Sequence, residues 1–149
     1  MKKEIEIFIP VALDLDWPTS GSVIECIKEQ NEKYGFKNFF LACPGGGWRS
    51  KGHPEKADFD RMADLFNDVK RGLSGTGISL GWWNPLTVKS GINDRFTRIV
   101  ESDGKTPPFA SCPLCESFKE QFAADIAYFA AKTKPVSIIF EDDYSIGTA

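Results

Sequence analysis

Four apolar segments along the chain have the composition of β-strands. Each is short, rich in Ile, Val, Leu or Phe, and bounded by Gly, Pro or polar positions. Because their apolar runs are nearly continuous, they are typical of parallel strands that are buried on both faces. The expected strands are 5–13, 36–43, 77–83 and 136–140.

Three segments between these strands have apolar residues at the three-and-four spacing of an amphipathic helix. The first begins near the hydroxyls of Ser20 and Ser22, which can cap a helix, and continues to about residue 34, where Gly35 ends it. The second is expected from about residue 54 or 55 to 73. The third is expected from about residue 112 or 113, with a proline early in the helix, until Pro135.

Alternating strands and helices predict right-handed βαβ units and an α/β fold. The favoured architecture is a parallel (β/α) half-barrel, TIM-barrel-like, with strand order 1-2-3-4. A flavodoxin-like open sheet that binds a nucleotide or flavin is the alternative. The loops that follow the strands are long and the turns that precede them are short, so either architecture would place a ligand site at the carboxyl ends of the strands.

The number of βα units limits what the chain can form by itself. A complete barrel takes eight units and about 250 residues, whereas these 149 residues contain three helices and four strands of that pattern. We therefore expect a single domain over 1–149 that is the N-terminal half of a larger barrel, ending soon after the fourth strand.

Charge and hydropathy exclude several classes of partner. The net charge is −3 and the basic residues are scattered, so neither nucleic acid nor an anionic membrane surface is an expected partner. No apolar run approaches the roughly 20 residues of a membrane span. The first residues alternate charged and apolar side chains, unlike a signal peptide, which favours a cytoplasmic protein.

Three consecutive carboxylates follow the fourth apolar segment directly: Glu141, Asp142 and Asp143. Burying an unpaired charge is costly, so these side chains should emerge at the carboxyl end of the strand. Carboxylates crowded at a partly desolvated rim shift each other's pKa values, and one with a raised pKa can act as a general acid. The alternatives are a solvated turn or a site for Ca²⁺ or Mg²⁺.

Aromatic and amide side chains are expected at the other strand ends. Trp82, Trp83 and Asn84 end the third segment, and this combination suits a sugar, which has an apolar ring face and a hydroxyl edge. A barrel would bring all four strand ends to one rim, so we predict a carbohydrate site there. Tryptophans that simply close the rim of the core are the alternative. The remaining residues expected to bind substrate are Asp14, Trp17, Trp48 and Arg49.

Other motifs give weaker signals. The glycines at 45–47 match neither phosphate-binding loop, so no cofactor is expected. His53, the only histidine, lies in a polar loop, where a histidine is usually exposed. Cys112 and Cys115 form a C-x-x-C pair, which can be redox-active or half of a zinc site. The sequence has no second such pair, so reduced thiols and no metal are the favoured interpretation.

The segment Phe140–Tyr144 resembles the strand-end acidic segments of a family of bacterial glycoside-hydrolase-like (β/α)8 barrels. The stretch Gly104–Pro108 and the pair Cys112-Pro113 are similar to what that family carries before its third helix, so the resemblance extends from residue 78 to 144. It implies a glycosidase acid/base at the fourth strand end. Glu141 matches that position best, and Asp142 or Asp143 is the alternative.

The resemblance also implies a nucleophile on a later strand that this chain does not contain. Glycoside hydrolysis normally needs two carboxyl groups at a defined spacing, so we expect little or no activity from this chain alone. The alternative function is a non-catalytic half-barrel that binds sugar or self-associates. Open sheet edges favour pairing with another chain, and a homodimer is therefore a further expectation.

Overall fold

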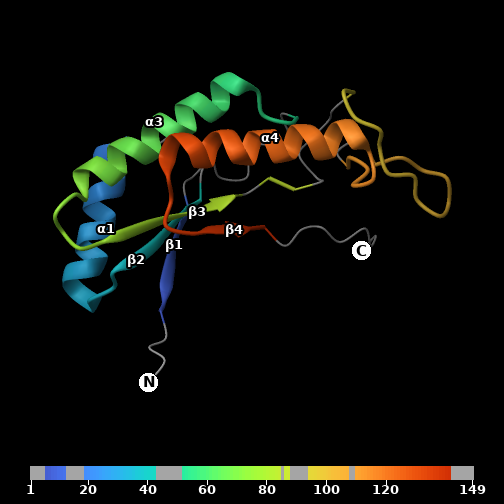
Figure 1. The fold of residues 1–149 in the computed structure, drawn as a ribbon. Coiled ribbons are helices and arrows are strands. Elements are labelled where there is room, and N and C mark those ends of the chain that lie inside the picture. Colours follow the sequence, from blue (N-terminus) through green and yellow to red (C-terminus); the bar gives the residue numbers. More distant parts are fainter. Residues whose placement is uncertain are drawn as a thin grey trace, which may run out of the picture.

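The computed structural model describes residues 6–12, 19–42, 52–84, 86–87, 94–107 and 110–141. The strands are β1 (Phe8–Ala12), β2 (Asn38–Ala42), β3 (Ser79–Asn84) and β4 (Ile138–Phe140). The helices are α1 (Ser20–Tyr34), α3 (Lys56–Gly72) and α4 (Glu116–Thr133). All strand pairs are parallel and the order is β1-β2-β3-β4 (Figure 1). The predicted α/β class and the sequential strand order are confirmed.

The ends of α1 follow from local side-chain chemistry, but the N-cap is Thr19 and not Ser20 or Ser22, the predicted capping residues. The Oγ1 of Thr19 accepts a hydrogen bond from the backbone N–H of Ser22 at 3.3 Å, which satisfies one of the free donors of the first turn. Gly35 ends the helix with φ of 75°, a conformation that favours glycine. The predicted bounds of this helix are therefore confirmed.

The start of α4 lies later than predicted. The backbone N–H of Cys115 donates to the carbonyl of Cys112 at 3.0 Å and closes a turn through Pro113, and Cys115 is then the N-cap of the helix. Proline is favoured both at the first position of a helix and at the second position of a turn. Here the turn forms, so the predicted helix start at residue 112 or 113 was wrong.

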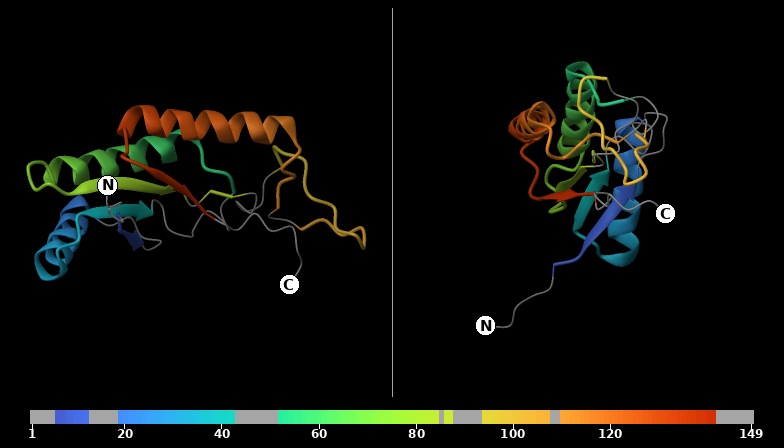
Figure 2. Two further views of the ribbon diagram at one scale, coloured as in Figure 1. Left: turned by 60° about the horizontal axis from the view of Figure 1, so that its bottom comes forward. Right: turned by 90° about the vertical axis from the view of Figure 1, so that its right-hand side faces the viewer.

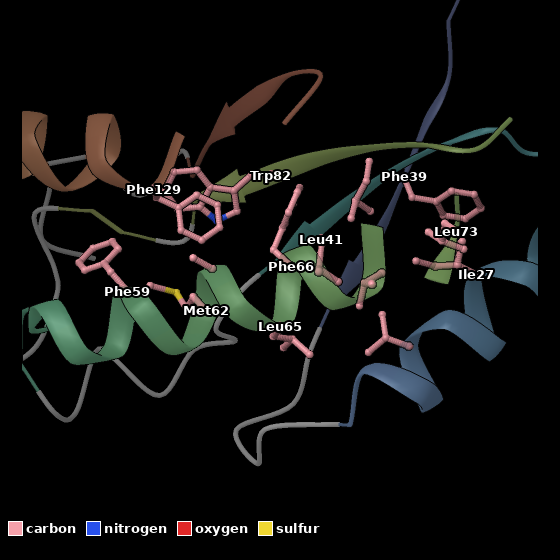
Figure 3. Packing of buried hydrophobic residues seen from close by; sticks show 14 of the residues in the cluster. Ile27, Phe39, Leu41, Phe59, Met62, Leu65, Phe66, Leu73, Trp82 and Phe129 are labelled. Carbon is pink, nitrogen blue, oxygen red and sulfur yellow. The ribbon is translucent and has the colours of Figure 1, made fainter. Parts of the chain in front are cut away.

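The three described helices contribute to one core on one face of the sheet (Figures 1 and 2). Alternate strand residues point into this core, among them Leu41 and Trp82, and α3 supplies the largest number of its helical side chains (Figure 3). α3 contacts both α1 and α4. Among the described helices, none has an apolar stretch long enough to cross a bilayer.

The opposite face of the sheet is apolar but has no described helix over it. The rings of Phe8 and Phe40 stack there with centroids 4.5 Å apart. A Cβ on Gly81 would lie 2.6 Å from the Phe40 ring, so this glycine makes room for the ring. Ile139 keeps 43% of its surface exposed. The prediction that the strands are buried on both faces is therefore wrong for the described part of the chain.

Candidate functional site

The carboxyl ends of β3 and β4 bring the side chains of two predicted site residues, Trp83 and Glu141, to one face of the sheet, and the backbone of a third, Asn84, joins the two strands there. The backbone N–H of Glu141 donates to the carbonyl of Asn84 at 3.1 Å, which extends the pairing one residue beyond β4. Trp83 is paired in register with Ile139, two residues before Glu141. Because side chains alternate along a strand, Trp83 and Glu141 belong to the same face of the sheet, the one without a helix.

Asn84 is fully buried at this edge and is only half satisfied. Its Oδ1 accepts a hydrogen bond from the backbone N–H of Leu86 at 3.1 Å and holds the turn that follows β3. Its Nδ2 has no acceptor among the described residues. Because Asn84 follows Trp83 directly, its side chain lies on the opposite face, the one that faces the core, and its role in this structure is to hold the turn after β3.

The adjacent tryptophans have different environments. Trp82 is fully buried, and its ring lies 3.9 Å from that of Phe129 in the core (Figure 3). It offers no face to a ligand, so its role in this structure is packing, contrary to the predicted substrate contact. Trp83 lies on the opposite face and is partly exposed. Of these two residues, Trp83 is the one that can contribute to a sugar platform.

The other predicted site residues lie outside the described residues. They are Asp14, Trp17, Trp48, Arg49, Asp142 and Asp143. The meeting of all four strand ends at one rim therefore stays a prediction, and the described part of that rim consists of the ends of β3 and β4.

His53 is buried and paired, which contradicts the expectation of an exposed loop histidine. Its side chain keeps only 1% of its surface exposed, and its Nε2 lies 2.7 Å from Oδ2 of Asp125 on α4. The rings of Phe96 and Phe118 meet the imidazole at steep angles, with centroids 5.4 Å and 6.4 Å away. Nδ1 has no partner among the described residues.

Hydrogen bonds connect this buried pair to the surface. Gln121 donates to Oδ1 of Asp125 at 2.9 Å, and Arg95 donates to Oε1 of Gln121 at 3.3 Å. Arg95 and Gln121 line an open groove of about 450 Å³ along the first half of α4. The other lining residues are Phe96, Ser117, Glu120 and Ala124.

Sequence reasoning missed Asp125, although the helical pattern contained a signal for it. Asp125 lies three residues after Phe122 and four before Phe129, the spacing that places all three on one face of the predicted helix. A carboxylate in such an apolar stripe needs a partner, because burying it alone is costly. The only histidine was the obvious candidate, but it lies 72 residues away in the sequence.

A second cluster of charges joins the outer surfaces of α3 and α4. Asp60 on α3 accepts hydrogen bonds from Lys132, Lys56 and Tyr128. These bonds, led by that from Lys132, hold the pKa of the Asp60 carboxyl well below its usual range. Since Tyr128 and Lys132 belong to α4, this cluster joins two neighbouring helices and has a structural role.

The C-x-x-C pair lies at the start of α4. The thiol of Cys115 has its pKa lowered to about 6, mainly by the hydrogen bond from the Ser117 hydroxyl and then by the backbone N–H of Phe118. The Ser117 Oγ lies 3.2 Å from the sulfur. In the part of the chain that the structure describes, no group of three or more His, Cys, Asp or Glu is arranged to hold a metal ion.

Comparisons with family models, with curated proteins and with solved structures each found no significant match.

Proposed function

We propose that the chain is the N-terminal half of a (β/α) barrel that binds carbohydrate at the carboxyl edge of its sheet. The observation that carries this proposal is the pairing of β3 and β4 at that edge. There the backbone N–H of Glu141 donates to the carbonyl of Asn84, and Trp83 is in register with Ile139, two residues before Glu141. A carboxylate and a partly exposed indole ring on one face of the sheet are groups that suit a sugar, whereas the buried Asn84 side chain lies on the other face and supports the edge from the core side.

The handedness of the connections between strands supports the barrel architecture in this proposal. When successive strands are added on the same side, right-handed crossovers place every helix on one face of the sheet. The described helices lie on one face and the strand order is sequential. The uncovered apolar face then corresponds to a barrel interior, which is filled by side chains from all strands. A flavodoxin-like sheet would carry helices on both faces.

Glu141 is the proposed general acid of the complete barrel. It is partly buried at the rim and lies on the same face of the sheet as Trp83, where it could protonate a glycosidic oxygen while the indole stacks on the sugar ring. Hydrolysis also needs a second carboxyl group across the scissile bond. We therefore propose that this chain binds sugar but does not hydrolyse it at a measurable rate.

The test is titration of the ¹⁵N-labelled chain with a panel of oligosaccharides, followed by amide chemical shifts. Shifts should concentrate at 83–86 and 138–141. The variant Trp83→Ala should weaken binding about tenfold, the equivalent of one lost aromatic contact, and Glu141→Gln should change affinity by less than threefold.

Matched controls are Tyr34→Ala and Glu32→Gln, an exposed aromatic and an exposed acid near the end of α1. Neither should change affinity. The absence of binding at millimolar sugar, or shifts confined to the helices, would contradict the proposal.

Self-association is a second candidate function, favoured by exposed apolar residues on the two edge strands and the residues that lead into them. Ile7 precedes β1, Val136 precedes β4, and Ile139 and Phe140 belong to β4; each keeps at least 43% of its surface exposed. Such edges tend to pair with other strands. A dimer by size-exclusion chromatography with light scattering, broken by Ile139→Lys but not by Val100→Lys, is expected. A monomer at high concentration would rule this candidate out.

A further inference from the structure

The cysteines at 112 and 115 lie in a turn that suits a disulfide. The N–H of Cys115 donates to the carbonyl of Cys112 at 3.0 Å, which closes a four-residue turn around Pro113 and Leu114. Such a turn keeps its first and fourth Cα atoms within about 7 Å of each other. Disulfide-bonded cysteines have Cα atoms about 4.4–6.8 Å apart, so a bond here requires little movement of the backbone.

Both ends of this turn are fixed by other parts of the structure. The N–H of Cys112 donates to the carbonyl of Thr97 at 2.7 Å, and Arg98 forms an antiparallel bridge with Ser111. On the other side, Cys115 is the N-cap of α4, and its carbonyl accepts the N–H of Lys119 at 3.0 Å. The turn therefore joins segment 94–107, which extends beyond the start of α4 (Figure 1), to a long helix.

We propose that Cys112 and Cys115 form a reversible dithiol–disulfide pair that locks segment 94–107 to the start of α4. Both thiols are partly accessible, as reaction with an external disulfide requires. The pair adjoins the groove on α4: Cys115 packs against the cluster of Phe96 and Phe118 and contacts Ser117, and Phe96 and Ser117 line that groove. Oxidation takes the Cys115 sulfur away from Ser117 and so alters one wall of the groove.

Cys115 is the attacking thiol. Its lowered pKa leaves it mostly as thiolate at neutral pH. The thiolate attacks one sulfur of a low-molecular-weight disulfide RSSR, forming Cys115–S–S–R and releasing RS⁻. Cys112 then loses its proton to solvent, attacks the Cys115 sulfur and releases the second RS⁻. In sum, two protein thiols and RSSR give one protein disulfide and two RSH, and an excess of RSH reverses the reaction.

The test uses the full chain in buffers of reduced and oxidised glutathione, quenched with acid, alkylated and digested with trypsin. Cleavage after Lys105 and Lys119 releases peptide 106–119, which contains Cys112 and Cys115 and no other cysteine. In oxidising buffer this peptide should lose two hydrogen masses and resist alkylation, and in reducing buffer it should take up two alkyl groups. Cys26, which is exposed, is the internal reference for an ordinary thiol.

Two variants separate the roles of the thiols. Cys112→Ser should accumulate the mixed disulfide of glutathione at Cys115, because the resolving thiol is gone. Ser117→Ala removes a hydrogen bond to the thiolate and should slow alkylation of Cys115 at pH 6 several-fold, without changing that of Cys26. The proposal is overturned if both cysteines carry glutathione separately, if neither reacts faster than Cys26, or if Zn²⁺ protects both while oxidant forms no bond between them.

Discussion

Replacing Asp125 with leucine tests whether the buried pair with His53 is a structural requirement. A leucine side chain is no smaller than an aspartate side chain, so the substitution leaves no cavity. Leucine also favours a helix slightly more than aspartate does, by about 0.5 kcal/mol. Any loss of stability must then come from the lost hydrogen bonds and not from a cavity. The His53 side chain is 1% exposed, so water cannot replace the carboxylate as partner of Nε2.

The expected magnitude follows from these contacts. A buried polar group left without its partner costs about 1–3 kcal/mol, and the lost bond from Gln121 costs about 1 kcal/mol more at this partly exposed site. After the gain in helix propensity, Asp125→Leu should lower the free energy of unfolding by about 2 kcal/mol. Replacing both partners with apolar residues removes the unsatisfied group, so His53→Phe with Asp125→Leu should lie within about 1 kcal/mol of the original protein.

The measurement is urea unfolding followed by tryptophan fluorescence, with the free energy obtained by linear extrapolation. Asp64→Leu, at an exposed position of α3, is the matched control and should change stability by less than about 0.5 kcal/mol. The reasoning is refuted if Asp125→Leu costs no more than this control. It is also refuted if the double variant is as unstable as Asp125→Leu alone, since the cost would then not arise from the unpaired imidazole.

Three further predictions concern packing, charge and capping. Gly81→Ala should destabilise the protein by about 1–3 kcal/mol because the new Cβ meets the Phe40 ring. Adding Phe40→Leu to this variant should recover part of the loss in thermal melts, and no recovery would refute the contact as the cause. Asp60 has a pKa below its ordinary value, so its contribution is fully present above about pH 4 and is lost as the pH falls towards the folded-state pKa. The stability gap between the original protein and Asp60→Asn should therefore be widest near pH 6 and narrow below pH 4, and a gap that does not change with pH would contradict this. Thr19→Ala should lower the free energy of unfolding, measured in urea, by about 0.5–2 kcal/mol because the N-cap of α1 is lost. A variant with the helix content and stability of the original protein would show that this cap contributes nothing.

Features fixed by neighbouring residues were predictable from the sequence. α1 has the predicted bounds and ends at the predicted Gly35, although Thr19 caps its start, and the three-and-four apolar spacing of the second segment correctly predicted an amphipathic helix, whose buried face includes Phe59, Met62 and Phe66. The alternation of strands and helices correctly predicted a parallel sheet, and the favoured sequential order is the observed one, although right-handed crossovers alone would also allow the order of an open sheet. In each case the determining interactions lie within a few residues of each other or follow from chirality.

Features fixed by distant residues were not predictable in the same way. An apolar run shows that a strand has two apolar faces but not what covers each, so the uncovered face with Phe8 and Phe40 was missed. Two adjacent tryptophans look alike in the sequence, yet alternation along β3 sends Trp82 into the core and Trp83 to the other face. Likewise, only the tertiary fold brings His53 to Asp125.

The position of Glu141 depends on α4 as much as on the sheet. β4 is only three residues long, and the residues before it add to its pairing with β3. The backbone N–H of Val136 donates to the carbonyl of Leu80 at 3.1 Å, and the N–H of Trp82 donates to the carbonyl of Ser137 at 2.9 Å. The preceding turn is held by Lys70 of α3, which donates to the carbonyls of Thr133 and Lys134 at 2.9 Å. Because so short a strand has few ladder bonds of its own, the bonds from Lys70 to the turn before β4 help to hold that strand, and with it Glu141, in place. The buried pair with His53, the charge cluster on the outer surface and the cysteines at the helix start all lie on α4, the helix that leads into β4 and Glu141.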